Sequence, residues 1–356
     1  MKNSIWTNRV LVIGALTLIS FLLSGCGGGS DGGTGAGGTT SSSGVSVSCT
    51  SSPVLTSAST FYGVTPEGGV GTWTFDTASL TSNYVVGAST GSTALTLDAA
   101  SCSYTSASTG VLRTAFASAN MDLAVSAATV AGVNTAALLM ASPETVLANA
   151  AGTYNLMIVE NQLTGGITTR TSTFATLQVD VAGAWSLCRG VAYSPTCGGS
   201  TGSFVTNAGG GFNLVSGGNT LGRVFVKATV AKKVLTVALN DTTTVPGTTV
   251  SGMWVGATND IFVSGASDGV YVTNTNEQST SLHTLAGLTL KPNARPTAVT
   301  VVPNQPVQGA FEIVTGDTVA GVMVNDVGIV SSLGIYADVT KSNSTSTGFI
   351  RFGVKP

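Results

Sequence analysis

The sequence is poor in charge. Only 8% of its 356 residues are Asp, Glu, Lys or Arg, and the formal net charge is −2. A surface with so few ionic groups has no basic field for nucleic acid, so nucleic acid is excluded as a partner. Hydroxyl and amide side chains fill the polar positions, and the chain contains 46 glycines. This composition is typical of an exported β protein rather than of a cytosolic enzyme.

The sequence also lacks the motifs of common cofactor enzymes. It has no P-loop lysine motif, no dinucleotide-binding glycine fingerprint after a strand and no C-x-x-C-H haem motif. Asn-Asp pairs at 240–241, 259–260 and 325–326 offer oxygen ligands of the kind calcium prefers, but such pairs at strand ends more often form Asx turns. We expect no cofactor and no metal site.

Histidine is nearly absent, and His283 is the only one in the chain. A Ser-His-Asp hydrolase would have to use it. The pattern G-x-S-x-G occurs at 28–32, 87–91, 198–202 and 265–269, but at none of these places between a strand and a helical pattern, as the hydrolase elbow requires. We expect Gly/Ser loops and a surface histidine, and we assign no catalytic residue. A carboxylate pair for glycoside hydrolysis stays open, because the acidic residues are scattered singly along the sequence.

The amino terminus reads as an export signal. Lys2 and Arg9 give a positive start, 10–23 is almost wholly apolar, and small residues follow. The run ends in Leu23-Ser24-Gly25-Cys26, which resembles the lipobox of bacterial lipoproteins. The resemblance covers about 26 residues. It implies that residues 1–25 are removed and that Cys26 becomes the first mature residue and carries the lipid.

The same resemblance implies a location. In lipoproteins of enteric bacteria, an aspartate after the lipidated cysteine retains the protein at the inner membrane, whereas this chain has Gly27. We therefore expect lipid anchoring at the outer membrane, on its periplasmic or surface face. Two or more acyl chains hold such an anchor stably, whereas one alone holds weakly.

A Gly/Ser/Thr-rich segment, 26–48, separates the anchor from the rest of the chain. It has almost nothing apolar to bury and is predicted to be a flexible tether, and its part 27–44 has an end-to-end distance of roughly 20–25 Å. We divide the remainder into an N-terminal β domain, 49–131, and a C-terminal β domain, 132–356. The chain length permits one large β domain or two smaller ones.

Four cysteines follow the lipobox. An even number in an exported chain is typical of disulfides, and four cysteines allow three connectivities. We favour Cys49–Cys102 and Cys188–Cys197, because each pair lies within one segment of the sequence. A four-cysteine zinc site is disfavoured, because the close cysteine pairs that zinc sites use are missing.

Short segments of alternating polarity predict an all-β fold. In 223–230, Val224 and Val226 share one face while Arg223 and Lys227 share the other, which is the period of a half-buried strand. We also expect a hairpin between 260–263 and 270–273, across a Gly-rich turn. The spacing of turns indicates an antiparallel sandwich or barrel.

One short helix is expected after Ser142. Ser142 can cap, Pro143 suits the first helical position and Glu144 favours the positive end. A helical turn ending near Asn149, then Gly-x-aromatic at 152–154 and a run of strands, resembles the start of a lipocalin-type barrel. The resemblance covers about ten residues, and Tyr154 stands where that family usually has Trp. It implies a barrel in the C-terminal part.

The loop that Cys188–Cys197 would close carries Arg189 and Tyr193, and we predict it as a binding surface. Our first hypothesis is a non-enzymatic lipoprotein that binds a protein or glycan, or attaches structurally, through loops on a disulfide-braced β scaffold. The alternatives are a barrel that holds a small apolar ligand, and an envelope hydrolase that uses His283 or a carboxylate pair.

Overall fold

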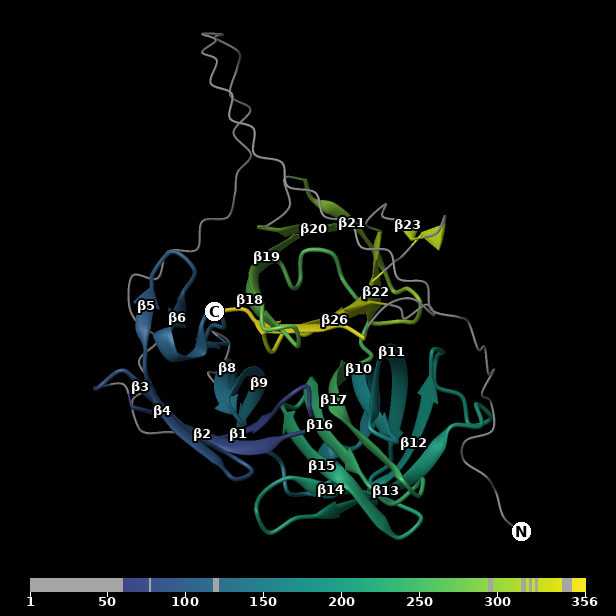
Figure 1. Ribbon diagram of the computed structural model, residues 1–356. Coiled ribbons are helices and arrows are strands. Elements are labelled where there is room, and N and C mark those ends of the chain that lie inside the picture. Colours follow the sequence, from purple (N-terminus) through teal and green to yellow (C-terminus); the bar gives the residue numbers. More distant parts are fainter. Residues whose placement is uncertain are drawn as a thin grey trace, which may run out of the picture. The chain divides into compact units, whose positions relative to one another are not determined.

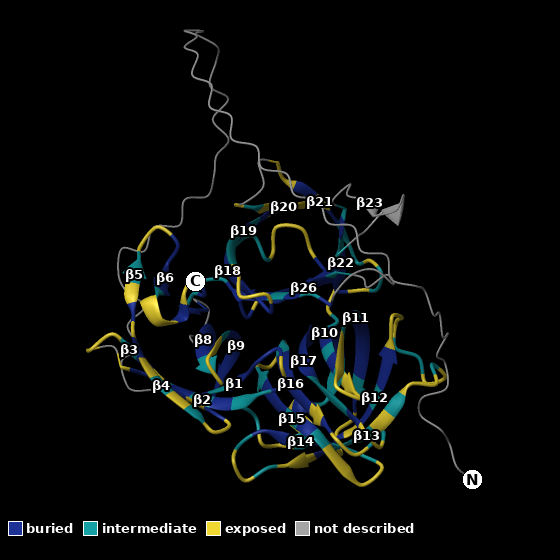
Figure 2. Ribbon diagram, viewed as in Figure 1, coloured by how far each residue is buried: buried dark blue, intermediate teal, exposed yellow. Residues whose placement is uncertain are grey.

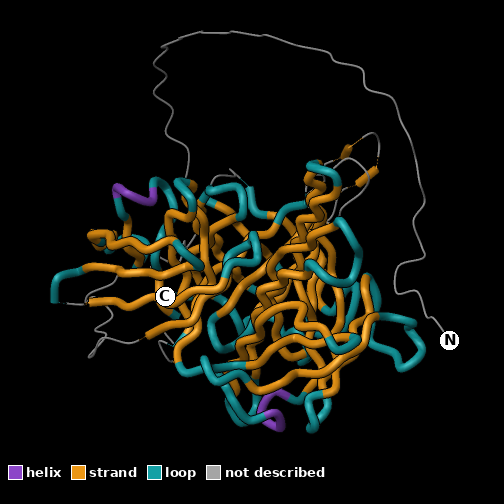
Figure 3. The backbone as a smooth tube through the Cα atoms, turned by 60° about the horizontal axis from the view of Figure 1, so that its bottom comes forward, coloured by secondary structure: helices purple, strands orange, loops and turns teal. Residues whose placement is uncertain are grey.

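The computed structural model describes residues 60–76, 78–117, 122–293, 297–314, 318–319, 322–323, 326–340 and 348–356 (Figure 1). All of them belong to one unit, Val45–Pro356. In these residues the helices are α1 (Leu147–Ala150) and a single 3-10 turn, η1 (Ala107–Thr109), and Figure 3 shows how little of the chain they occupy. The predicted all-β fold class is confirmed.

The first sheet has seven antiparallel strands in the order β4-β3-β2-β1-β9-β8-β7. These strands are β1 (Thr60–Val64), β2 (Val70–Asp76), β3 (Thr81–Val86), β4 (Ser89–Ala94), β7 (Ala115–Phe116), β8 (Leu123–Val130) and β9 (Val133–Ala141). A two-stranded sheet, β5 (Thr96–Asp98) with β6 (Ser103–Thr105), lies between β4 and β7 in the sequence.

The next eight strands close into a barrel in sequence order. They are β10 (Gly152–Thr164), β11 (Ile167–Val179), β12 (Ala184–Arg189), β13 (Ser200–Thr206), β14 (Phe212–Ser216), β15 (Asn219–Ala228), β16 (Lys233–Asp241) and β17 (Thr248–Thr258). The ring is completed by antiparallel pairing of β10 with β17. This is the barrel that the Gly-x-aromatic pattern implied.

A second barrel, also of eight strands, follows the first. Its strands are β18 (Gly269–Thr275), β19 (Thr280–Ala286), β20 (Thr289–Pro292), β21 (Val299–Pro303), β22 (Ala310–Val314), β25 (Asp326–Val330), β26 (Ile335–Thr340) and β27 (Ile350–Val354). Pairing of β18 with β27 closes the ring. Between β22 and β25 in the sequence, β23 (Thr318–Val319) pairs with β24 (Val322–Met323).

The two barrels begin alike. Gly152 and Gly269 both have φ of +154°, a value that L side chains rarely adopt. Two residues later, the Tyr154 hydroxyl donates to Ala150 O at 2.6 Å and the Tyr271 hydroxyl donates to Ser267 O at 2.7 Å. Each tyrosine is fully buried and fixes the start of its barrel to the preceding turn.

One buried cluster joins the first sheet to both barrels. It includes Leu138 of β9, Val255 of β17 and Ile335 of β26, each less than 2% exposed. The amide of Asn274 adds two hydrogen bonds to the backbone of Arg113, at 2.8 and 3.1 Å. Figure 2 shows the buried residues running along the strands, and the exposed ones in turns and on strands such as β13. Burial of apolar surface between the sheets therefore holds them together.

The predicted division at residues 131 and 132 falls inside a hairpin of the first sheet. Val130 pairs with Val133, and Ala131 and Gly132 have φ of +50° and +82°, as in a two-residue hairpin turn. Such a turn sends the chain back into the same sheet. The predicted segment 132–356 accordingly divides into β9 of the first sheet and two separate barrels.

The predicted helix starts later than its capping pattern indicated. Ser142 has φ of +46° and does not cap, and the N-cap position of α1 is Val146, whose side chain makes no capping hydrogen bond. The backbone N–H of Glu144 donates instead to Val226 O in the first barrel, at 2.8 Å. That tertiary hydrogen bond replaces the local capping arrangement.

The prediction of a hairpin between 260–263 and 270–273 is wrong for its first strand. Residues 259–268 are not a strand but connect the two barrels. Phe262 turns inward from this connection, is 9% exposed and packs edge-on against Phe311 at 5.6 Å between ring centroids. The apolar residues that resembled a strand therefore close one end of the second barrel.

Candidate functional site

The interior of the first barrel is filled by its own side chains. Ile158, Leu177, Val237 and Trp254 lie in one buried cluster, and each is 3% exposed or less. Trp185 is buried in the same cluster, as expected for a core aromatic. Alternate residues of each strand point inward, so apolar side chains from many strands meet inside the ring. This barrel is a packed core.

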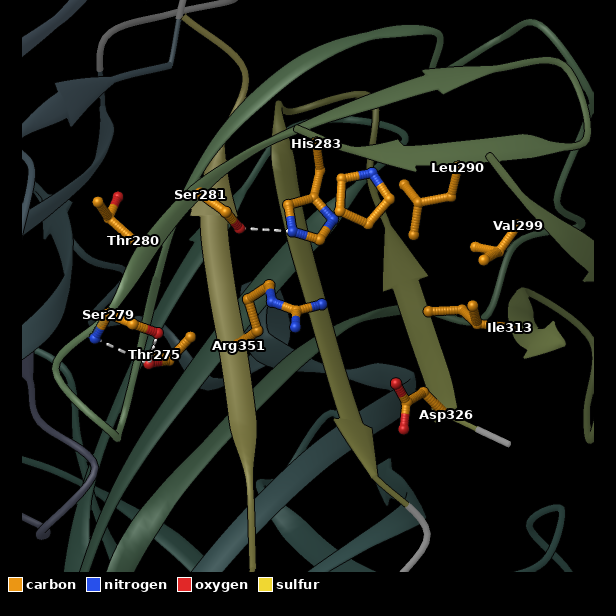
Figure 4. A pocket seen from close by; sticks show the side chains of 11 residues that line it. Thr275, Ser279, Thr280, Ser281, His283, Leu290, Val299, Ile313, Asp326 and Arg351 are labelled. Atoms are coloured by element: carbon orange, nitrogen blue, oxygen red, sulfur yellow. Dashed lines mark hydrogen bonds between the residues drawn. The ribbon is translucent and has the colours of Figure 1, made fainter. Parts of the chain in front are cut away.

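The second barrel is packed only at one end. Phe262, Tyr271, Phe311 and Tyr336 form an apolar plug there with Leu285. At the other end, where β18 turns into β19, the barrel holds a cavity of about 320 Å³ (Figure 4). This volume is at the lower end of the range of small-molecule sites in proteins.

The cavity has two unlike walls. Its polar side carries Thr275, Ser281, His283, Asp326 and Arg351, from β18, β19, β25 and β27. Its apolar side carries Leu290, Pro292, Val299 and Ile313, from β20, β21 and β22. Figure 4 shows His283 and Arg351 reaching into the space between the walls. A ligand that fits both walls is amphipathic.

The expectation of a surface histidine is wrong, because His283 is 0% exposed. Its Nε2 lies 2.6 Å from the hydroxyl of Ser281, two residues away on the same face of β19. Burial, with the positive charge of Arg351 as the second cause, lowers the pKa of His283 well below its usual range. The ring is therefore neutral at pH 7.

Arg351 forms an ion pair with Asp338 inside the barrel. Nη1 lies 3.1 Å from Oδ2 of Asp338, whose side chain is 0% exposed. Burial raises the pKa of Asp338 to about 7 and outweighs the opposite effect of Arg351. For Arg351, burial would lower the pKa, but the negative charges of Asp338 and Asp326 raise it. The guanidinium stays charged, and it faces the carboxyl of Asp338, which ionises as the pH rises through about 7, and the charge of Asp326.

Ser281 and His283 do not make a catalytic triad in the described part of the chain. Nδ1 of His283 has no hydrogen-bond partner there, so no carboxylate orients the ring for proton transfer. The described G-x-S-x-G segments lie in the β3–β4 turn, at the start of β13 and in the connection that leads into β18, and 28–32 lies outside the described residues. No three His, Cys, Asp or Glu side chains in these ranges could hold a metal ion.

The predicted binding loop lies on the first barrel, apart from this cavity. A disulfide joins Cys188 and Cys197 across it, with 5.8 Å between the Cα atoms. Arg189 donates to Oε1 of Glu160 at 2.7 Å, while Tyr193 is half-buried. Cys102 is disulfide-bonded as well, but its predicted partner, Cys49, lies outside the described residues, as does Cys26.

Sequence reasoning missed Asp338 and Arg351. A signal was present, because Asp338 stands between Ala337 and Val339, and Arg351 between Ile350 and Phe352. A charged residue between apolar neighbours on a strand must point to the opposite face from them. Here that face is the inside of a barrel, which only the closure of β18 on β27 defines.

Comparisons with known proteins leave the family open. No family model and no curated protein matches the chain. A protein of unknown function in the DUF3598 family of Nostoc punctiforme PCC 73102 is 11% identical with a TM-score of 0.17, and the match covers 60% of this chain and 98% of that one.

Two further similar structures are transferrin-binding proteins B. The protein from serogroup B Neisseria meningitidis is 10% identical with a TM-score of 0.22, and the match covers 81% of this chain and 66% of that one. A double mutant of the protein from Haemophilus parasuis Hp5 is 9% identical with a TM-score of 0.24, and the match covers 81% and 65%. At such values these similarities carry no argument about function.

Proposed function

We propose that this chain is a non-enzymatic lipoprotein of the cell envelope, held by a lipid on Cys26, that binds a small molecule in its second barrel. The main observation that supports this proposal is the cavity of about 320 Å³ with one polar and one apolar wall. Small-molecule sites are typically concave and mostly apolar, with a few placed polar groups. The lipobox supports the anchor, and the first barrel, filled by its own side chains, serves as scaffold.

The test is native mass spectrometry of protein extracted gently from membranes, with one variant that fills the cavity. Val299 lines the apolar wall, so Val299→Phe places a ring in the ligand's space. Val205 is 46% exposed on β13 and makes Val205→Phe the matched control. We expect a small-molecule adduct on the wild type and on Val205→Phe, and its loss from Val299→Phe. An adduct that survives Val299→Phe, or a wild type that is always empty, would overturn the proposal.

The loop between β12 and β13 is the second candidate, for a protein or glycan partner. Its disulfide fixes the loop, and Val191 within it is 50% exposed. Arg189 and Tyr193 flank that residue. If this loop carries the function, Val191→Asp should abolish capture of a partner by the intact protein while leaving any adduct in the second barrel in place.

A further inference from the structure

The hydrogen bonds around Ser281 set the tautomer of His283. The hydroxyl of Thr273 donates its single hydrogen to the backbone carbonyl of Ser281, at 2.9 Å. The two hydroxyl oxygens lie 3.1 Å apart and either could donate; since the carbonyl is the nearer acceptor for Thr273, we assign the hydrogen between the hydroxyls to Ser281. The Ser281 oxygen can then only accept from His283, and Nε2 of the neutral ring carries the proton.

This assignment leaves Nδ1 of His283 as a bare acceptor. The side chain is 0% exposed, and Nδ1 meets no donor within the part of the chain that the structure describes. A buried acceptor without a donor costs free energy, because it has lost its water without replacement. In Figure 4 the ring of His283 stands beside Ser281, among the residues that line the cavity. A ligand in the cavity is placed to supply the missing donor.

The charges in the cavity disfavour an anion. Arg351 is the only cation among the residues that line it, and its guanidinium is paired with Asp338. Asp326 lines the same cavity and adds a second carboxylate. Since the ring of His283 is neutral, the wall offers no unbalanced positive charge at pH 7 or above.

We infer that the cavity takes a small uncharged molecule that donates an N–H or O–H hydrogen to Nδ1 of His283 and lays an apolar body against Leu290, Val299 and Ile313. The inference rests on the proposed function and names the ligand class of the same site. This ligand differs from the small apolar ligand of the alternative hypothesis, because it carries a hydrogen-bond donor.

The experiment uses the full-length protein in detergent, labelled with ¹⁵N at histidine. His283 is the only histidine, so the imidazole signals need no assignment. Long-range ¹H–¹⁵N spectra should show a protonated Nε2 and an unprotonated Nδ1. Phenol, anisole and benzoate are then titrated: phenol carries a donor, anisole has the same ring without one, and benzoate is an anion.

Phenol should shift the Nδ1 resonance and bind about fivefold more tightly than anisole, as expected for one buried hydrogen bond. Benzoate should bind more weakly than phenol. His283→Leu should abolish the preference for phenol over anisole, whereas His283→Gln, which keeps an acceptor, should retain it. If neither variant folds, the wild-type tautomer and the three titrations decide alone.

A proton on Nδ1, equal binding of phenol and anisole, tightest binding of benzoate, or no binding of phenol would each overturn the inference. The proposed function fails separately, through a wild-type protein that carries no adduct when gently extracted. If the gently extracted protein carries an adduct but any of these four results is found, the binding site in the second barrel stands and the inferred class of ligand is wrong.

Discussion

Nη1 of Arg351 lies 3.1 Å from Oδ2 of Asp338 inside the second barrel, and the carboxyl side chain is wholly buried. Removing one partner of a buried ion pair leaves the other charge without compensation. Arg351→Met should therefore lower the free energy of unfolding by about 3–5 kcal/mol, as measured by urea denaturation.

The matched control is the ion pair of Arg189 with Glu160, whose arginine side chain is 36% exposed. Arg189→Met should cost no more than about 1 kcal/mol, because water screens a pair at the surface. Equal losses in the two variants would contradict the ion-pair account of the barrel interior.

The two buried titratable groups, Asp338 and His283, should make opposite contributions to the pH dependence of the free energy of unfolding. The pKa of Asp338 rises from 3.8 to about 7 on folding, so its contribution to stability is lost as pH rises through that range. The pKa of His283 falls well below 6.5 on folding, so its contribution is lost as pH drops below 6.5. Below pH 6.5 the two contributions therefore change with pH in opposite directions and offset each other.

Substituting one of the two groups should reveal how the other alone makes the free energy of unfolding depend on pH. In Asp338→Asn, the free energy of unfolding should fall as pH is lowered below about 6.5, by up to about 1.4 kcal/mol per pH unit. In His283→Gln, it should fall instead as pH is raised from about 4 to 7. Urea denaturation across this range measures both, and slopes of the same sign in the two variants would show the assignment of the groups to be wrong.

The disulfide of the β12–β13 loop should stabilise the first barrel. Cys188 and Cys197 are nine residues apart. On the chain-entropy account, opening so short a loop by the double substitution to alanine costs at most about 3 kcal/mol. The second barrel does not contain this loop, so ligand retention there should not change. A loss of the native adduct in the double alanine variant would mean that the two barrels are coupled.

Lipid attachment is tested by metabolic labelling with an alkyne fatty acid. Cys26→Ser should abolish the label, since the thiol is the acceptor in a lipobox. The double alanine variant at Cys188 and Cys197 should keep it, which excludes labelling of these two cysteines. A label that persists in Cys26→Ser would contradict the proposed anchor.

The strand pattern was readable from the sequence where it depends on local alternation. Residues 223–230 overlap β15, and Val224 and Val226 do point to the inside of the first barrel. The alternation places Phe225 on the opposite face with Arg223 and Lys227, and in the structure Phe225 is fully buried there against the other sheets. Local periodicity shows which residues share a face of a strand, but not whether a second layer covers that face.

The second barrel could not be foreseen, because its closure is a long-range event. Val272 pairs with Val354, 82 positions along the chain, and no local signal specifies such a partner. The cavity depends on the same closure, which brings Asp338 and Arg351 to His283. The sequence shows that a charged residue lies within a strand, but it does not show which side chain faces that residue across the barrel.

The most direct measurement is a set of nuclear Overhauser effects between bound phenol and the methyl groups of the protein. We predict contacts from the phenol ring to the methyls of Val299 and Ile313, which line the apolar wall of the cavity. The contacts should vanish in Val299→Phe and persist in Val205→Phe. Contacts confined to Val191, in the disulfide-closed loop, would contradict the account and move the binding site to the first barrel.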